Sequence, residues 1–235
     1  MGRALRIIPV LDLKGGEVVR AEKGERDRYR PIMTPLSASS DPVAVADGLR
    51  RLHPFSTFYI ADLDAIEGGA PNSAALAGLR AMPEAAEFWV DAGIAEEDRL
   101  AAALTEPSFC AVLGSESQRD DVLLRRFRDR HRLILSLDFF ADGFRGPRSL
   151  LEPELWPQKV IVMTLAKVGS GAGPDFARLK EIKVRAGGRT IIAAGGVRGE
   201  ADIRELSSLG IAAALVATSL HDGTLTSGQL ASLGA

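Results

Sequence analysis

Two aspartates occupy matching positions in the chain, in the segments Leu11-Asp12-Leu13 and Leu137-Asp138-Phe139. Each closes a short apolar run of the kind that forms a buried strand. Two carboxyl groups that face each other can divide proton transfer between a donor and an acceptor. If both strands end at the same edge of one sheet, the pair predicts acid/base chemistry. A single aspartate at a strand end would more simply hold a loop backbone.

Segments of the first half of the chain recur in the second half. The turn at 68–72 returns at 171–175, and the strand at 111–115 returns at 214–218. The anchor pairs 71 and 174, 93 and 196, and 114 and 217 are each 103 residues apart. Asp12 and Asp138 are 126 residues apart, so the first half carries a longer loop. A doubled fold with one acid in each half predicts a site on the axis that relates the halves.

Short apolar runs alternate with longer amphipathic segments, which is typical of parallel strands covered by helices. The expected strands are Ile7–Leu11, Thr57–Ala61, Phe88–Val90, Phe109–Leu113, Leu133–Leu137, Val160–Thr164, Thr190–Ala194 and Ala213–Ala217. Helices are expected to begin at Asp41-Pro42, Asn72 and Pro174-Asp175, to fill Gln118–Arg130, and to end before Gly210. Pro147, Pro153 and Pro157 leave room for only a short piece around Leu150–Trp156.

This element order predicts an α/β fold, a (β/α)8 TIM barrel with an internal half-barrel repeat and a shortened fifth helix. We expect residues 1–235 to form one such barrel, because no linker or low-complexity tract divides them. A formal net charge of −2 argues against a nucleic-acid partner. The single cysteine, Cys110, excludes an internal disulfide and a cysteine-rich metal site. No apolar run approaches the roughly 20 residues that span a bilayer, and no signal peptide opens the chain, so we expect a cytoplasmic protein without a membrane partner.

Glycines and hydroxyl side chains follow the last two expected strands, where barrels often bind phosphate. This predicted phosphate site consists of Gly195, Gly196, Thr218 and Ser219. A second anion site is possible at the equivalent place in the first half, at Gly93, Gly114 and Ser115. It is the weaker of the two, because Asp91 stands in the same turn and repels an anion unless a cation pairs with it.

Other side chains near the expected strand ends are candidates for contact with a substrate: Arg20, Asp62, Asp64, Asp91 and Lys167. Lys167 could anchor an anion, form a Schiff base if buried, or be a solvated surface lysine. Asp62 and Asp64 lack a nearby histidine, and we expect no metal. Thr164 could orient a substrate hydroxyl or pack in the core. The long loop at 21–40 contains Lys23, Arg26, Arg28 and Arg30, which form either a solvated basic surface or a lid that binds an anion.

The segment Ile8–Arg20 resembles the opening of the histidine-biosynthesis barrels. The resemblance continues through Asp62–Ile66, Ser136–Asp138, Ala193–Val197 and Leu220–Thr226, and it is stronger to the phosphoribosylformimino aminoimidazole carboxamide ribotide isomerases than to the sister cyclases. It implies a metal-free and cofactor-free Amadori rearrangement of an aminoaldose to an aminoketose. In that reaction Asp12 would remove the sugar C2 proton, Asp138 would be the general acid that opens the ring, and Thr164 would assist.

The chain also departs from the pattern of that family. Asp91-Ala92-Gly93 stands where the family has three glycines, Ala217 replaces a glycine, and an acidic residue is missing within Leu165–Gly169. The loop Phe139–Arg145 is altered as well. The substrate of the family carries two phosphates, whereas here one phosphate site is intact and the other is remodelled. These changes resemble a divergent isomerase-like branch of methanogens and methanopterin-using methylotrophs.

Three functions remain open at this point. The first is an isomerase that acts on a phosphorylated sugar-type metabolite through Asp12 and Asp138. The second is a lyase or isomerase that acts on a monophosphate in one-carbon cofactor metabolism, with Asp91 and Lys167 active. The third is a barrel without catalysis that binds a phosphorylated metabolite or a partner. The oligomeric state is left open.

Overall fold

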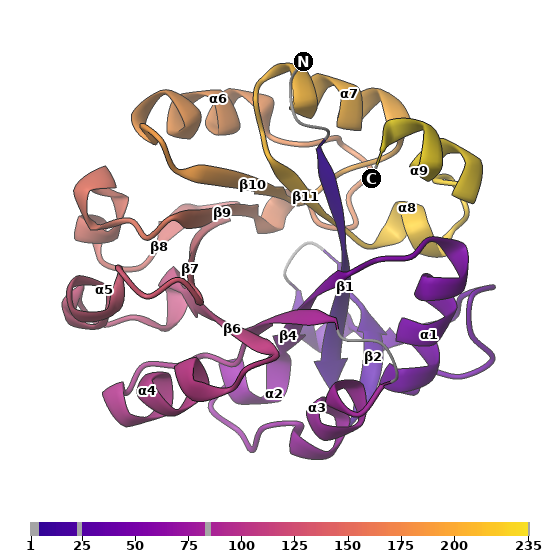
Figure 1. Ribbon diagram of the computed structural model, residues 1–235, viewed down its shortest axis with the longest axis horizontal. Helices are drawn as coiled ribbons and strands as arrows, with labels where there is room; N and C mark the ends of the chain where they lie inside the picture. Colours follow the sequence, from indigo (N-terminus) through magenta and orange to yellow (C-terminus); the bar gives the residue numbers. More distant parts are fainter. Residues whose placement is uncertain (1–4, 23–24, 83–85, 235) are drawn as a thin grey trace.

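The computed structural model describes residues 5–22, 25–82 and 86–234. Within these ranges, parallel strands close into a barrel of eight, because the last strand pairs with the first (Figure 1). In order around the barrel they are β1 (Arg6–Lys14), β4 (Thr57–Asp62), β5 (Glu87–Asp91), β6 (Phe109–Gly114), β7 (Leu133–Phe140), β9 (Lys159–Thr164), β10 (Thr190–Ala194) and β11 (Ala213–Val216). The predicted (β/α)8 TIM barrel is therefore confirmed, and every expected strand is found.

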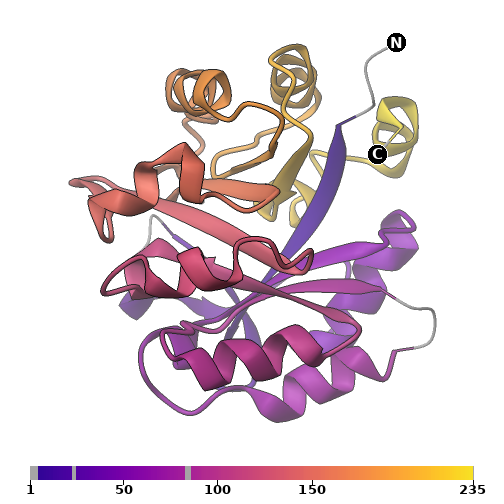
Figure 2. The ribbon, with the colours of Figure 1, turned by 60° about the vertical axis from the view of Figure 1, so that its left-hand side comes forward.

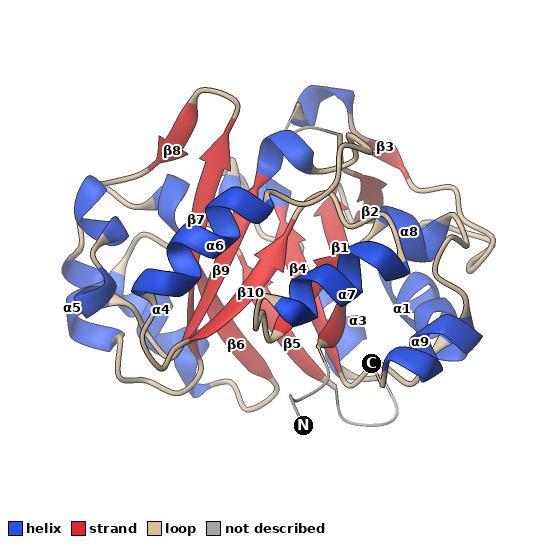
Figure 3. Ribbon diagram, turned by 90° about the horizontal axis from the view of Figure 1, so that it is seen from above, coloured by secondary structure: helices blue, strands red, loops and turns tan. Residues whose placement is uncertain are grey.

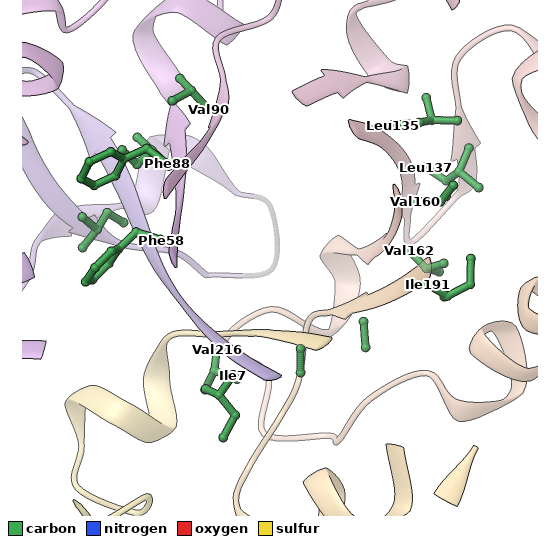
Figure 4. Close-up of a cluster of buried hydrophobic side chains, with 14 of the residues drawn as sticks. Ile7, Phe58, Phe88, Val90, Leu135, Leu137, Val160, Val162, Ile191 and Val216 are labelled. Atoms are coloured by element: carbon green, nitrogen blue, oxygen red, sulfur yellow. The ribbon is translucent and has the colours of Figure 1, made fainter. Parts of the chain in front are cut away.

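The barrel strands are buried on both faces, and successive side chains alternate between them. Outward-facing side chains such as Phe58, Leu137 and Val162 form the larger core beneath the helices (Figure 4). Inward-facing side chains such as Ile8, Trp89 and Ile134 fill the centre of the barrel. The same inward positions carry acidic and small polar side chains toward the carboxyl ends of the strands, and this change of composition opens a site there.

Helices surround the barrel (Figures 1 and 2). The longer ones are α1 (Pro42–Leu52), α3 (Ser73–Arg80), α4 (Glu97–Thr105), α6 (Phe176–Arg185), α7 (Glu200–Ser208) and α9 (Ser227–Leu233), and short turns α2 (Leu63–Ile66) and α8 (Thr218–His221) follow β4 and β11. Asp41 and Asp175 accept backbone N–H bonds as N-caps of α1 and α6. Asn72 begins α3, 103 residues before Asp175, so the internal repeat is visible in the structure.

One expected helix is shorter than the sequence pattern indicates, and the fifth helix is reduced, as the prolines predicted. The segment Gln118–Arg130 contains only α5 (Val122–Phe127). Gln118 is buried and donates to Ile94 O at 2.7 Å, and this bond holds the residues between Gln118 and α5 in a loop. In place of a fifth helix there are two 3-10 turns, η3 (Arg148–Leu151) and η4 (Pro153–Leu155). Proline lacks an N–H donor and biases the preceding residue away from helical geometry, which accounts for the interruption.

Antiparallel extensions rise beyond the carboxyl ends of β1 and β7 (Figure 3). The strand β2 (Glu17–Arg20) pairs with β1 and with the short β3 (Arg30–Pro31), and β8 (Gly143–Arg145) pairs with β7. The turn η1 (Arg26–Arg28) lies between β2 and β3. These extensions bring loop residues to the mouth of the barrel. No helix in the described ranges is long and apolar enough to cross a membrane.

Candidate active site

A cavity of about 540 Å³ opens at the carboxyl ends of the barrel strands. Asp12 of β1 and Asp138 of β7 both line it, and they enter from opposite sides of the barrel. The wall also contains Tyr59, Asp91, Glu116 and Arg26 at one end, and the loops after β9, β10 and β11 at the other. The two halves of the chain thus contribute one acid each to a shared space.

Asp12 is the acid with the fewest constraints. It occupies an inward position of β1, opposite Ala61 of β4 and Val19 of β2. Within the described part of the chain its carboxylate has no hydrogen bond and no ion pair, and its exposed surface faces the cavity. Burial raises the pKa of Asp12 to about 7, although the nearby Arg26 guanidinium lowers it. A carboxyl group with such a pKa can accept or release a proton near neutral pH.

Asp138 is held in a defined orientation by the strand and loop around it. Its Oδ1 accepts from Ser136 Oγ at 2.6 Å, and its Oδ2 accepts from the Glu116 backbone N–H at 3.1 Å. The Ser115 hydroxyl accepts from the Asp138 backbone N–H and lies 3.2 Å from Oδ2. Burial raises the pKa of Asp138 to about 6, against the effect of these hydrogen bonds. Asp12 and Asp138 therefore both titrate close to neutral pH.

Asp91 adds a third buried carboxyl group, and its position depends on Gly114. A Cβ atom on Gly114 would lie 2.9 Å from Asp91 Oδ2 and 3.4 Å from Asp138 Oδ2, so only glycine leaves room for both acids. Tyr59 Oη lies 3.5 Å from Asp91 Oδ2, and Gly93 N–H donates to Oδ1 at 3.1 Å. Burial and then the charge of Asp138 raise the pKa of Asp91 to about 7. Burial followed by the surrounding carboxylates raises the pKa of Tyr59.

Arg26 is the residue of the basic loop at 21–40 whose charged side chain lines the cavity. Its guanidinium forms an ion pair with Glu116 at 2.5 Å, across 90 residues of sequence, and its carbonyl accepts from Lys14 Nζ at 3.3 Å. Arg28 and Arg30, by contrast, are exposed. The sequence pattern identifies Arg26 only as one of four basic residues, and it misses Glu116 and Tyr59 altogether. The alternation of inward positions on the strand at 57–61 is the signal that could have identified Tyr59.

The predicted phosphate residues Gly195, Gly196, Thr218 and Ser219 all line the far end of the cavity. Both glycines have positive φ. A Cβ atom on Gly195 would lie 2.5 Å from the carbonyl oxygen of Thr164, at the end of β9, and one on Gly196 would lie 2.5 Å from the carbonyl oxygen of Gly173, in the loop after β9. Ser219 Oγ donates to Val197 O at 3.1 Å and ties the loops after β10 and β11 together. A compact backbone turn with a threonine hydroxyl beside it is suited to an anionic group.

Several candidate residues lie outside this cavity. Thr164 is at an outward-facing position of β9, and its neighbours Met163 and Leu165 line the wall instead. The side chains of Lys167 and Arg20 do not line the cavity either; Lys167 packs its Cβ beside Gly195 and Gly196, and Arg20 is exposed at the end of β2.

The possible second anion site, at Gly93, Gly114 and Ser115, is not formed. Gly93 packs against Ile66, and its N–H donates to Asp91. The Ser115 hydroxyl is buried between Asp138 and Arg145 O. Two carboxylates occupy the space beside Gly114, so an anion would be repelled there.

Asp62 and Asp64 belong to a structural clasp and do not line the cavity. Asn72 Nδ2 donates to Asp62 Oδ1 at 2.7 Å and to Asp64 Oδ2 at 2.8 Å. Asp64 also accepts from Gly15 N–H at 2.7 Å, and Asn72 Oδ1 accepts from Gly16 N–H at 2.7 Å. The clasp joins the β1–β2 turn to the loop before α3. Asp62 is fully buried, so its carboxylate needs these partners.

Asn72→Ala should therefore lower the free energy of unfolding by about 1 to 2 kcal/mol, because the buried Asp62 carboxylate loses a hydrogen bond to the Asn72 side chain. Urea unfolding followed by circular dichroism measures the change. Ser73→Ala is the matched control, since Ser73 is the exposed next residue on α3. Equal stability of the two variants would contradict the clasp.

A (β/α)8 barrel with acids and a glycine-lined turn around one cavity at its carboxyl ends defines a class of protein: the barrel enzymes that act on small molecules. The sequence model for the histidine biosynthesis protein family matches residues 6–226. The chain belongs to this family.

Individual relatives are similar over nearly the whole chain. An uncharacterized protein of Methanocaldococcus jannaschii is 26% identical over 231 residues, which cover 94% of this chain and 95% of the relative. Two relatives are named 1-(5-phosphoribosyl)-5-((5-phosphoribosylamino)methylideneamino) imidazole-4-carboxamide isomerase. That of Symbiobacterium thermophilum is 29% identical over 261 residues (97% and 96% of the two chains), and that of Chloroflexus aurantiacus is 27% identical over 242 residues (94% of each). The family relationship thus extends to isomerases at low identity.

Proposed function

We propose that the protein is an isomerase of the aldose–ketose type, which acts on a small phosphorylated sugar-type metabolite by acid/base catalysis through Asp12 and Asp138. The observation that carries the proposal is that the two acids line one cavity from opposite halves of the barrel. A second support is the named activity of the isomerase relatives, whose names specify a substrate with a phosphoribosylamino group.

The environments of the two acids suit different tasks. Asp12 has no hydrogen-bond partner in the described chain and can approach a substrate C–H group, which suits a general base. Asp138 is fixed by Ser136 and by the Glu116 backbone, which suits an acid that must present its proton in one direction. One proton shared between the two groups gives the active form. The pKa of Asp12 is about 7 and that of Asp138 about 6, so singly protonated pairs exist near neutral pH. Asp12, with the higher pKa, holds the proton in most of them, and the productive arrangement, with the proton on Asp138, is the smaller fraction.

A phosphate on the substrate would bind at Gly195, Gly196 and Thr218, which fixes the sugar between the acids. Ser219 supports that turn through its bond to Val197. The Arg26–Glu116 pair covers the opposite end and would limit the access of water to the reacting atoms. No observation favours Lys167 as a Schiff-base amine, because its side chain does not line the cavity.

Proton exchange tests the proposal whatever product the enzyme forms. We expect the protein, in D2O, to remove the C2 hydrogen of an N-substituted 5-phosphoribosylamine and to form the ketose, in which C2 is a carbonyl and C1 has gained a deuterium from the solvent, as measured by NMR. The panel should include the substrate that the isomerase relatives' names specify. If folded protein neither forms the ketose nor introduces deuterium at C2 of the recovered compound for any member of the panel, the assignment is contradicted.

A further inference from the structure

The two ends of the cavity differ in chemistry. The end formed by the loops after β10 and β11 presents mainly backbone and hydroxyl groups, together with Arg198, which is paired with Asp202, and Asp222. The opposite end presents Asp91, Glu116 and Tyr59, and Asp138 adjoins it. The isomerase relatives are named for a substrate with two phosphoribosyl groups. A cavity with this asymmetry does not suit a ligand that is anionic at both ends.

The cations that line the cavity in the described chain are already paired. Arg26 is bound to Glu116 at 2.5 Å. Arg198 is bound to Asp202 through Nε at 2.9 Å and a terminal nitrogen at 2.7 Å. Asp12, Asp91 and Asp138 have no ion-pair partner among the described residues. The acidic end therefore has an excess of carboxyl groups, which a cation from outside the protein could balance.

Asp91 is placed to be the ligand for such a cation. Its residue is only 7% exposed, and the carboxylate borders the cavity. Oδ1 is occupied by Gly93 N–H, whereas the nearest donor to Oδ2 is the Tyr59 hydroxyl at the long distance of 3.5 Å. Gly114 leaves room for this carboxylate beside Asp138. A buried carboxyl group without a charged partner is costly to retain unless it acts on a ligand.

We propose that Asp91 binds a protonated amino group of the substrate, so that the enzyme selects a monophosphate with an amine at its far end and rejects a second phosphate there. The Tyr59 hydroxyl, beside Asp91 Oδ2, completes this ammonium subsite. The inference rests on the proposed function, because it takes the glycine-lined end as the position of the single phosphate. The proposed substrate, a monophosphate with an amine, belongs to a different class from the substrate in the relatives' names, which carries two phosphoribosyl groups.

The test uses ω-aminoalkyl phosphates with two to six carbons, each paired with the ω-hydroxyalkyl phosphate of the same length, in titration calorimetry. At one length the amine should bind the wild-type protein about tenfold more tightly, since a charged hydrogen bond replaces a neutral one. Asp91→Asn should remove this preference and leave the affinity of the hydroxyalkyl phosphates unchanged. Asp98→Asn, an exposed substitution on α4, should retain the preference.

The outcomes separate the inference from the proposed function. If the hydroxyalkyl phosphates bind but no length shows an amine preference, the ammonium subsite is wrong and the phosphate end stands. If neither series binds, both assignments fail. Asp91→Glu guards against a folding defect in Asp91→Asn, because it keeps the charge and moves it by one methylene. It should shift the preferred amine to a shorter chain, and an unchanged optimum would overturn the proposal.

Discussion

Asp12→Asn and Asp138→Asn should each lower the turnover of the substrate by about two to four orders of magnitude, the usual contribution of a general acid or base. Asparagine keeps the shape of each side chain but cannot transfer the proton. Asp12 has no hydrogen bond to lose in the described structure, so Asp12→Asn should leave the fold intact. Steady-state kinetics by NMR, with the substrate identified by the deuterium test, measures both effects.

The control for these variants is Asp98→Asn, which changes an exposed aspartate that does not line the cavity. A further readout separates catalysis from positioning: in D2O, Asp12→Asn should abolish the loss of the C2 hydrogen even when the substrate is saturating. Turnover near that of the wild type in either active-site variant would show that the pair does not transfer the protons. Loss of circular dichroism signal in a variant would require Asp12→Ser or Asp138→Ser as a replacement.

Asp91→Asn should raise the free energy of unfolding at pH 8, even though it removes a charged group. The folded pKa of about 7 lies above the ordinary value of 3.8, so the folded state binds this proton more tightly than the unfolded state. The stabilisation that the proton provides is complete below about pH 4 and is lost as the pH rises to about 7. A shift of this size corresponds to roughly 4 kcal/mol.

Water in the cavity and coupling to Asp138 reduce the observable effect, and we expect Asp91→Asn to be about 2 to 3 kcal/mol more stable than the wild type at pH 8. Below about pH 4 the carboxyl group is protonated in the folded and the unfolded wild-type protein and resembles the amide, so the two proteins should be nearly equal there. The difference should grow as the pH rises from about 4 to about 7, and urea unfolding from about pH 3.5 to 8 measures it. A constant difference between the variant and the wild type at all pH values would show that Asp91 is not held in a raised-pKa site.

The pattern of apolar runs was sufficient to predict the fold. Every strand was found, and the caps at Asp41 and Asp175 begin the expected helices. The helix expected at 118–130 is shorter than predicted and shows the limits of local signals, whereas the reduced fifth helix around Leu150 was predicted from its prolines. In the segment 118–130, a buried hydrogen bond from Gln118 to the Ile94 carbonyl overrides the helical pattern.

It was harder to predict which side chains of each strand point into the barrel and which point toward the helices. The strand at 160–164 is apolar at almost every position, so its sequence does not say which side chains turn inward. The choice of Thr164 as a site residue assumes the inward face, whereas the register of β9 places Met163 there. A shift of one residue exchanges the two faces of a strand. Likewise, Asp62 and Asp64 follow β4 at a place typical of site residues, but hydrogen bonds to Asn72 bury one and hold both.

The sequence by itself determined that eight strands end at one edge of the barrel. It also placed Asp12, Asp138 and the Gly195-Gly196 turn at those strand ends. Hydrophobic periodicity and chain order specify these positions locally. Only the tertiary structure decided that Asp91, Tyr59 and the Arg26–Glu116 pair share one cavity with them. These residues meet through barrel closure and through a contact across 90 residues, and the raised pKa values exist only because that closure removes the acids from water.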